Sequence, residues 1–160
     1  MGSSAKVPMT IQGKKKLEDE LKRLLQVERP SVIKAIEDAR SLGDISENAD
    51  YDAAKERQAW IEARIGEIQG NLVSAEVVDT AKIKSTKIVF GASVVLLDVE
   101  AGEESTYQIV GVDEADVKAG KLSVMSPLAR SLIGKVAGDS VEVQNPKGIK
   151  EYEIIKFFYR

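Results

Sequence analysis

The sequence predicts an α+β protein in which an N-terminal antiparallel helical hairpin precedes a smaller domain of strands and one helix. Two observations support this fold class. Apolar residues recur every three or four positions up to about residue 80, and then at every second position in short β-branched runs. The helical pattern breaks at residues 80–86. We therefore expect a helical domain over 9–80, a second domain over 81–160, and a disordered N-terminus or tag remnant over 1–8.

The first helical segment begins near Thr10, a candidate N-cap, and carries an interrupted apolar seam. The spacings are mostly three and four, and the seam consists of Leu17, Leu21, Leu24, Leu25, Val32, Ile33, Ile36 and Ala39. The period stutters near Pro30. Because proline lacks a backbone N–H, we expect a kink or a local change of register there.

The second helical segment has a regular seam, with spacings of 4, 3, 4, 3, 4 and 3, formed by Ala54, Gln58, Ile61, Ile65, Ile68, Leu72 and Ala75. A period of 3.5 residues is typical of a coiled coil. Gly43, Asp44 and Ser46 provide turn residues between the segments, so the two helices should pack as an antiparallel hairpin. Helices of about 27 residues would be about 40 Å long. The turn would then be the tip of a rod.

The C-terminal half contains short β-branched runs separated by Gly, Asp and Asn-Pro-Lys-Gly turns. The expected strands are 87–100, 104–111, 121–125, 139–144 and 149–159. One short helix is expected over 126–134, with Ser126 as N-cap, Pro127 at the first helical position and Gly134 at the end. These elements predict a small antiparallel sheet with one helix.

The composition limits the chemistry that the chain can carry. There is no Cys and no His, which excludes disulfides, the usual zinc sites, thiol nucleophiles and imidazole catalysis. A bound metal would therefore be a hard cation held by oxygen. The net charge of -3 argues against non-specific coating of nucleic acid. Without an apolar run of roughly 20 residues or a signal segment, we expect a cytoplasmic protein with no membrane contact.

The turn between the two helices concentrates negative charge in four carboxylates: Asp44, Glu47, Asp50 and Asp52. The spacing of Asp44 and Glu47 matches a helix capping box, with Asp in the usual Ser or Thr position. A calcium loop fits poorly, because the sixth position is Ala49 rather than Gly and the twelfth is Lys55 rather than Glu. A third interpretation is an exposed acid pair that completes a metal site with ligands from a partner. Spacing alone leaves the first and third interpretations open.

The turn and the C-terminal half both resemble the GreA/GreB family of bacterial transcript-cleavage factors. Residues 42–58, "LGDISENADYDAAKERQ", are similar to the family signature Gly-Asp-Leu-x-Glu-Asn-Ala-x-Tyr followed by Ala-Ala-Lys/Arg-Glu. The runs "VFGASVVLLD", "YQIVGVDEAD", "SVMSPLARSLIGKVAGD" and "YEIIKFFY" resemble the C-terminal domain of the family. "VDEAD", "SPLARSLIG" and the low net charge favour the GreA-like members over the more basic GreB-like members.

The resemblance implies a coiled-coil domain and an FKBP-like C-terminal domain. It implies that the C-terminal domain docks at the rim of the secondary channel of RNA polymerase, while the coiled coil enters the channel. The tip would reach the active site when the nascent RNA 3′ end is backtracked, and the polymerase would then hydrolyse its own transcript. The chain would be an accessory factor, not an enzyme, and is expected to be a monomer. A channel-binding inhibitor without cleavage activity remains the alternative.

The resemblance also assigns roles to particular residues. Asp44 and Glu47 would be the functional acids, recruiting the second Mg²⁺ of the polymerase site without holding a metal stably alone. Tyr51 would contact RNA or the active-site wall, or would brace the tip. The polymerase-binding segment would be Met125, Ser126 and Pro127, with Met125 replacing the usual Asp or Asn of the family.

The remaining charged residues and a prolyl isomerase activity are the last features considered. Asp50 and Asp52 are interpreted as a solvated face or a general negative field. A solvated face is also expected for a basic cluster formed by Lys14, Lys15, Lys16, Lys22 and Arg23. The family resemblance implies a basic patch on the coiled coil that contacts RNA, and this is the alternative for the cluster. A prolyl isomerase would need an aromatic-lined pocket, but the few aromatic residues over 82–160 gather mostly at the C-terminus.

Overall fold

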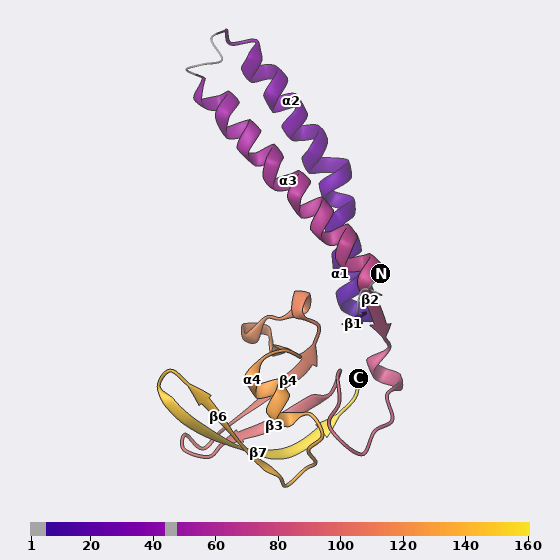
Figure 1. The fold of residues 1–160 in the computed structure, drawn as a ribbon, viewed down its shortest axis with the longest axis vertical. Coiled ribbons are helices and arrows are strands. Elements are labelled where there is room, and N and C mark those ends of the chain that lie inside the picture. The colour runs from indigo at the N-terminus through magenta and orange to yellow at the C-terminus, as the bar shows by residue number, and fades with distance from the viewer. Residues whose placement is uncertain (1–5, 44–47) are drawn as a thin grey trace, which may run out of the picture. The chain divides into compact units, whose positions relative to one another are not determined.

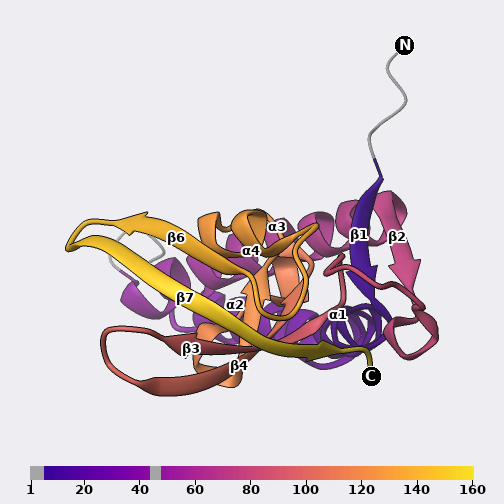
Figure 2. The ribbon, with the colours of Figure 1, turned by 90° about the horizontal axis from the view of Figure 1, so that it is seen from below.

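A computed structural model describes residues 6–43 and 48–160. These residues form two compact units, one comprising residues 14–43 and 48–75 and the other combining 6–13 with 76–160. The boundaries expected from the sequence, 9–80 and 81–160, differ from these units, because residues 9–13 and 76–80 belong to the second unit. Strand β1 (Val7–Thr10) pairs with strand β2 (Ala75–Val78), as Figure 2 shows. A disordered N-terminus was expected over 1–8 and helix over 9–80. Residues 7–10 and 75–78 form strands instead, because the two short segments pair with each other.

The first unit is an antiparallel helical hairpin, as predicted (Figure 1). One arm is a continuous series of α1 (Ile11–Arg23), the π-helical segment η1 (Leu24–Glu28) and α2 (Arg29–Arg40). The other arm is α3 (Ala49–Ser74), whose 26 residues span about 39 Å at 1.5 Å per residue. The hairpin therefore extends for most of the length expected from the apolar periodicity.

The π-helical segment accounts for the stutter in the first arm. The buried residues of this arm are Leu17, Leu24, Val32, Ile36 and Ala39. The step from Leu24 to Val32 is eight residues, whereas a heptad step is seven. The backbone N–H of Arg29 donates to the carbonyl of Leu24, five residues back, so η1 accommodates the extra residue. Pro30 follows directly, and the predicted change of register is confirmed.

The seam of α3 is buried where its heptad pattern predicts. Ile61, Ile65 and Ile68 are at most 4% exposed. Ala75, expected to close the seam, instead begins β2. Charged side chains join the two arms outside the seam, and the cross-arm pairs are Arg64–Glu20, Arg29–Glu62 and Arg57–Glu28.

The second unit is built on a five-stranded sheet in the order β5-β4-β3-β7-β6. The strands are β3 (Ser93–Asp98), β4 (Glu103–Val110), β5 (Lys121–Ser123), β6 (Ser140–Asn145) and β7 (Gly148–Phe158). All five predicted strands form, but the expectation of a purely antiparallel sheet is wrong. β5 pairs parallel to β4, because two 3₁₀ turns, η4 (Val112–Glu114) and η5 (Val117–Ala119), form the crossover.

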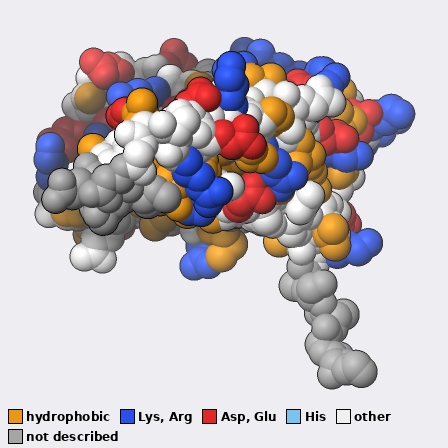
Figure 3. All heavy atoms as spheres, turned by 90° about the horizontal axis from the view of Figure 1, so that it is seen from above, with side chains coloured by type: hydrophobic (Ala, Val, Ile, Leu, Met, Phe, Trp, Pro, Cys, Tyr) orange, Lys and Arg blue, Asp and Glu red, His pale blue; other side chains and the backbone are white. Residues whose placement is uncertain are grey.

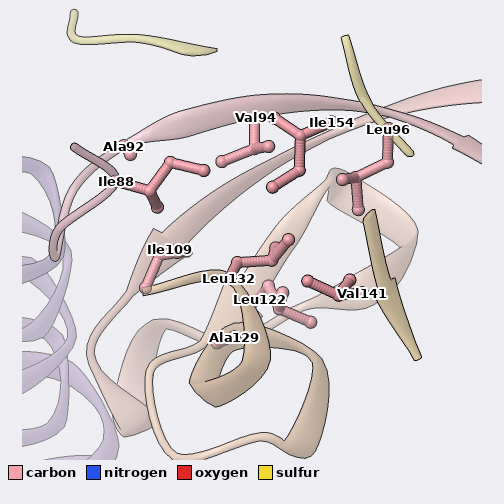
Figure 4. Close-up of a cluster of buried hydrophobic side chains, with 10 residues drawn as sticks. All are labelled: Ile88, Ala92, Val94, Leu96, Ile109, Leu122, Ala129, Leu132, Val141 and Ile154. Atoms are coloured by element: carbon pink, nitrogen blue, oxygen red, sulfur yellow. The ribbon is translucent and has the colours of Figure 1, made fainter. Parts of the chain in front are cut away.

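Helix α4 (Pro127–Leu132) covers the core face of this sheet. Figure 4 shows Ala129 and Leu132 directed toward the sheet residues Val94 and Ile154, and all four side chains are fully buried. The helix begins as predicted, with Ser126 at the N-cap and Pro127 at the first position. This packing fixes the segment 125–127 relative to the sheet.

A second set of contacts anchors the beginning of α1 within the same unit. The Gly13 N–H donates to Thr10 Oγ1 at 3.0 Å, which confirms Thr10 as the N-cap. The Glu114 carboxylate accepts from the Thr10 N–H at 3.0 Å, from the Gly111 N–H at 2.9 Å and from the Thr10 hydroxyl. Gly13 leaves room for this carboxylate, because a Cβ at position 13 would overlap the side chain of Glu114.

Candidate functional site

The turn of the hairpin is defined by the residues on either side of the predicted acid pair. Helix α2 ends at Arg40, and the Gly43 N–H donates to the Arg40 carbonyl at 3.3 Å. Gly43 has φ +108°, a backbone conformation that favours glycine. Asp44 and Glu47 lie outside the described residues, so their predicted roles stay predictions.

Asn48 begins the second arm and ties it to the first. Its side chain accepts from the Tyr51 N–H at 3.1 Å, as an N-cap does, and its amide donates to the Ala39 carbonyl. Helix α3 therefore starts with Asn48 as its cap, whereas Asp44 and Glu47, the capping box considered from the sequence, lie outside the described residues. The sequence signal for this cap was an Asn followed by the acidic residues Asp50 and Asp52, which are typical of a first helical turn.

Tyr51 lies in the first turn of α3 and is half-buried. The Arg40 guanidinium carbon is 5.9 Å from the centroid of the Tyr51 ring, within the range of a cation–π contact. This contact joins the last residue of α2 to the first turn of α3. The geometry favours the bracing role expected for Tyr51, while a contact with RNA remains a prediction.

The other acidic residues near the turn are exposed. Asp50 and Asp52 lie in the first turn of α3, where carboxylates interact favourably with the helix dipole. The calcium-loop alternative is ruled out, because residues 49–55 are helical and cannot provide an open ligand loop. Over 6–43 and 48–160, no group of three acidic side chains is placed to hold a metal ion. A metal site at the turn would therefore depend on Asp44, Glu47 and external ligands.

Cross-arm ion pairs support the geometry of the hairpin. Arg64 donates two hydrogen bonds to Glu20, at 2.7 and 2.8 Å, and these bonds lower the pKa of Glu20 and raise the pKa of Arg64. Arg29 makes a similar two-bond contact with Glu62 and lowers the pKa of that carboxyl. Such pairs between facing helices help to select one register of the two arms.

The predicted polymerase-binding segment divides into exposed and structural residues. Met125 is 55% exposed and Pro127 is also exposed, so both are available to a partner. Ser126 is half-buried, and its hydroxyl donates to the Ser123 carbonyl at 2.7 Å while accepting from the Ala129 N–H at 3.3 Å. Ser126 therefore shapes the segment that presents its two neighbours. Polymerase contact by Met125, Ser126 and Pro127 stays a prediction.

The basic residues of α1 are exposed. The side chains concerned are Lys14, Lys15, Lys16, Lys22 and Arg23. Lys15 pairs with Asp19 at 3.7 Å, and Figure 3 shows acidic and basic side chains interspersed over the face in view. The exposure of these side chains and the ion pair of Lys15 fit the predicted solvated role. None of the helices described is long and apolar enough to cross a membrane.

Comparisons with known proteins agree with the resemblance seen in the sequence. A family model described as "Transcription elongation factor, N-terminal" matches residues 7–77, and one described as "Transcription elongation factor, GreA/GreB, C-term" matches residues 82–159. A protein of Phenylobacterium zucineum named transcription elongation factor GreA is 58% identical over 151 residues, which are 94% of this chain and 96% of that protein.

Two further matches have the same extent. The transcription elongation factor GreA of Maricaulis maris is 55% identical over 150 residues, covering 94% of this chain and 96% of that protein. The crystal structure of GreA factor homolog 1 of Thermus thermophilus is 27% identical, covers 96% of this chain and 99% of its own, and superposes with a TM-score of 0.44. Both family models and the curated relatives span nearly all of the sequence, so the chain belongs to the GreA/GreB family of transcription elongation factors.

Proposed function

We propose that this chain binds bacterial RNA polymerase through the secondary channel and stimulates the polymerase to hydrolyse backtracked nascent RNA near its 3′ end. The observation that carries the proposal is the position of the family signature in the fold. Gly43 and Asn48, which flank Asp44 and Glu47 in the sequence, lie just beyond the end of α2 and at the start of α3, and α3 is about 39 Å long. A narrow pair of helices can carry two carboxylates into a channel that excludes a globular domain.

In this proposal the two carboxylates act together with ligands of the polymerase. Bound Mg²⁺ would supply positive charge that activates the attacking water and stabilises the leaving oxygen. Asp44 and Glu47 would offer additional oxygen ligands, directly or through water, because two carboxylates alone do not satisfy the octahedral preference of Mg²⁺. The surrounding residues of the chain hold the turn in place, through the Asn48 cap and the contact of Arg40 with Tyr51.

The C-terminal unit would provide the docking surface at the channel rim. Met125 and Pro127 are exposed next to the Ser126 cap, on a segment held against the sheet by α4. A rigid exposed segment loses little conformational entropy on association, which favours its use as a contact. The chain would contribute no active site of its own, and the chemical step would belong to the polymerase.

The acid pair can be tested by removing its charge with little change in size. The double variant Asp44→Asn with Glu47→Gln is mixed with halted, backtracked RNA polymerase and Mg²⁺, and transcript length is followed over time. The matched control is Asp50→Asn with Asp52→Asn, which removes the same charge from the exposed first turn of α3. We expect loss of cleavage in the first variant and near wild-type cleavage in the control. Equal cleavage by the two variants would refute the assignment.

A further inference from the structure

A small polar hollow lies on the core face of the five-stranded sheet and is formed by strands of the second unit alone. Its volume is about 160 Å³, and its lining consists of Leu96, Asp98, Glu103, Ser105, Tyr107, Lys150 and Tyr152. Pockets for small-molecule ligands usually measure roughly 300–1,000 Å³. The hollow therefore has space for one side chain of a partner, and not for a cofactor.

Two carboxylates face each other across neighbouring strands in this hollow. Asp98 of β3 is directly opposite Glu103 of β4. Like charges in directly opposed positions destabilise a strand pair. Lys150 of β7 compensates only one of them, with its Nζ 3.2 Å from Asp98 Oδ2. Among the described residues, Glu103 forms no ion pair.

The remaining walls suit a planar cation. The half-buried rings of Tyr107 and Tyr152 line the hollow together with Ser105. An aromatic ring attracts a guanidinium at its face, and opposed carboxylates can accept its forked N–H groups. A proline ring matches less well, because Asp98, Glu103 and Lys150 place charges where an apolar ring would lie. The charged lining thus argues against the prolyl isomerase considered from the sequence.

We propose that this hollow receives an arginine side chain presented by a protein partner. The guanidinium would lie between Asp98 and Glu103 and against the tyrosine rings, giving Glu103 a counter-ion. In the free protein, Asp98 Oδ1 accepts hydrogen bonds from the backbone N–H groups of Glu100 and Ala101, and Asp98 Oδ2 pairs with Lys150. The incoming arginine therefore competes with Lys150 for Oδ2. The inference rests on the sheet alone and does not depend on transcript cleavage or on the residues of the hairpin turn.

The test uses N-acetyl-arginine methylamide as a probe and follows its binding to the full-length, isotope-labelled chain by NMR. The neutral citrulline analogue, which keeps the shape but loses the charge, is the ligand control. We expect saturable shifts of the Ser105, Tyr107 and Tyr152 amides with the arginine probe and none of comparable size with citrulline. Equal shifts with both probes would overturn the proposal.

Variants of neighbouring residues make the test specific. Glu103→Gln should raise the Kd of the probe about tenfold, as expected for loss of a charge-assisted contact. Glu104→Gln is the matched control, because successive side chains of a strand point to opposite faces of the sheet, and it should change Kd by less than about twofold. Lys150→Met should lower Kd by about threefold or more, because it removes the competing ammonium. Equal weakening by the Glu103 and Glu104 variants, or weaker binding to the Lys150 variant, would also overturn the proposal.

Discussion

Gly13 and Glu114 provide the sharpest test of how the beginning of α1 is anchored. The Glu114 carboxylate accepts hydrogen bonds from two backbone N–H groups and from the Thr10 hydroxyl, and it occupies the space beside the Gly13 Cα. In the variant Gly13→Ala, the new Cβ would lie closer than 3.0 Å to three side-chain atoms of Glu114. Because non-bonded carbon and oxygen atoms cannot approach that closely, the carboxylate must leave its donors.

The size of the effect depends on the contacts that are lost and on helix propensity. Loss of three charge-assisted hydrogen bonds at a partly buried site costs about 2–4 kcal/mol. Replacing a helical glycine by alanine raises the free energy of unfolding by up to about 1 kcal/mol. Gly13→Ala should therefore lower the free energy of unfolding by about 1–4 kcal/mol. In a Glu114→Ala background, the same substitution should be neutral or stabilising by up to about 1 kcal/mol.

Urea unfolding followed by circular dichroism measures all four members of this double-mutant cycle. Gly66→Ala is the matched control, since Gly66 is also helical, but its Cβ would meet no atom within 4 Å apart from the neighbouring residues and the backbone of its own helix. This control should stabilise the protein by about 1 kcal/mol. If Gly13→Ala has the same effect with and without Glu114, within about 0.5 kcal/mol, the steric argument is wrong.

Three further predictions concern the hairpin. Because Arg64 lowers the pKa of Glu20, this pair stabilises the fold above the unfolded-state pKa, and the contribution is lost as the pH falls through the lower folded-state pKa. Wild type should therefore exceed Glu20→Gln in urea stability at about pH 6 and lose that advantage toward about pH 3. Asn48→Ala should cost about 1–2 kcal/mol in the same assay, by removing the cap of α3. Ile68→Ala should cost about 2–5 kcal/mol and lower Tm, because Ile68 is fully buried.

Periodicity predicted most of the secondary structure because burial follows it. The 3.5-residue seam of α3 and the alternation along the five strands both reflect side chains that face a core. The stutter near Pro30 indicated a disturbance, although its form as a π-helical turn depends on the register with α3. Local patterns do not specify which strands pair, so the parallel β4–β5 pairing and the pairing of β1 with β2 could not be predicted.

At the candidate site, too, features that depend on neighbouring residues in the sequence could be predicted, and contacts between the two arms could not. The Asn48 cap was accessible from residue type and position, whereas the capping box considered for Asp44 and Glu47 satisfied the spacing rule and lies outside the described residues. The contact of Arg40 with Tyr51 requires the two arms to be placed side by side, which no local pattern provides. The functional assignment of Asp44 and Glu47 came from family resemblance, because spacing did not decide between capping and chemistry.

Transcript cleavage promoted by the acid pair at the polymerase active site is the activity on which the proposed function depends. The most direct measurement adds the wild-type chain to purified, backtracked bacterial RNA polymerase carrying a 5′-labelled transcript and varies the Mg²⁺ concentration. We expect a shortened transcript that can be extended again, with cleavage at lower Mg²⁺ than the polymerase alone requires. A chain that binds the polymerase but leaves transcript length and Mg²⁺ dependence unchanged would contradict the proposed function and would favour the inhibitor alternative.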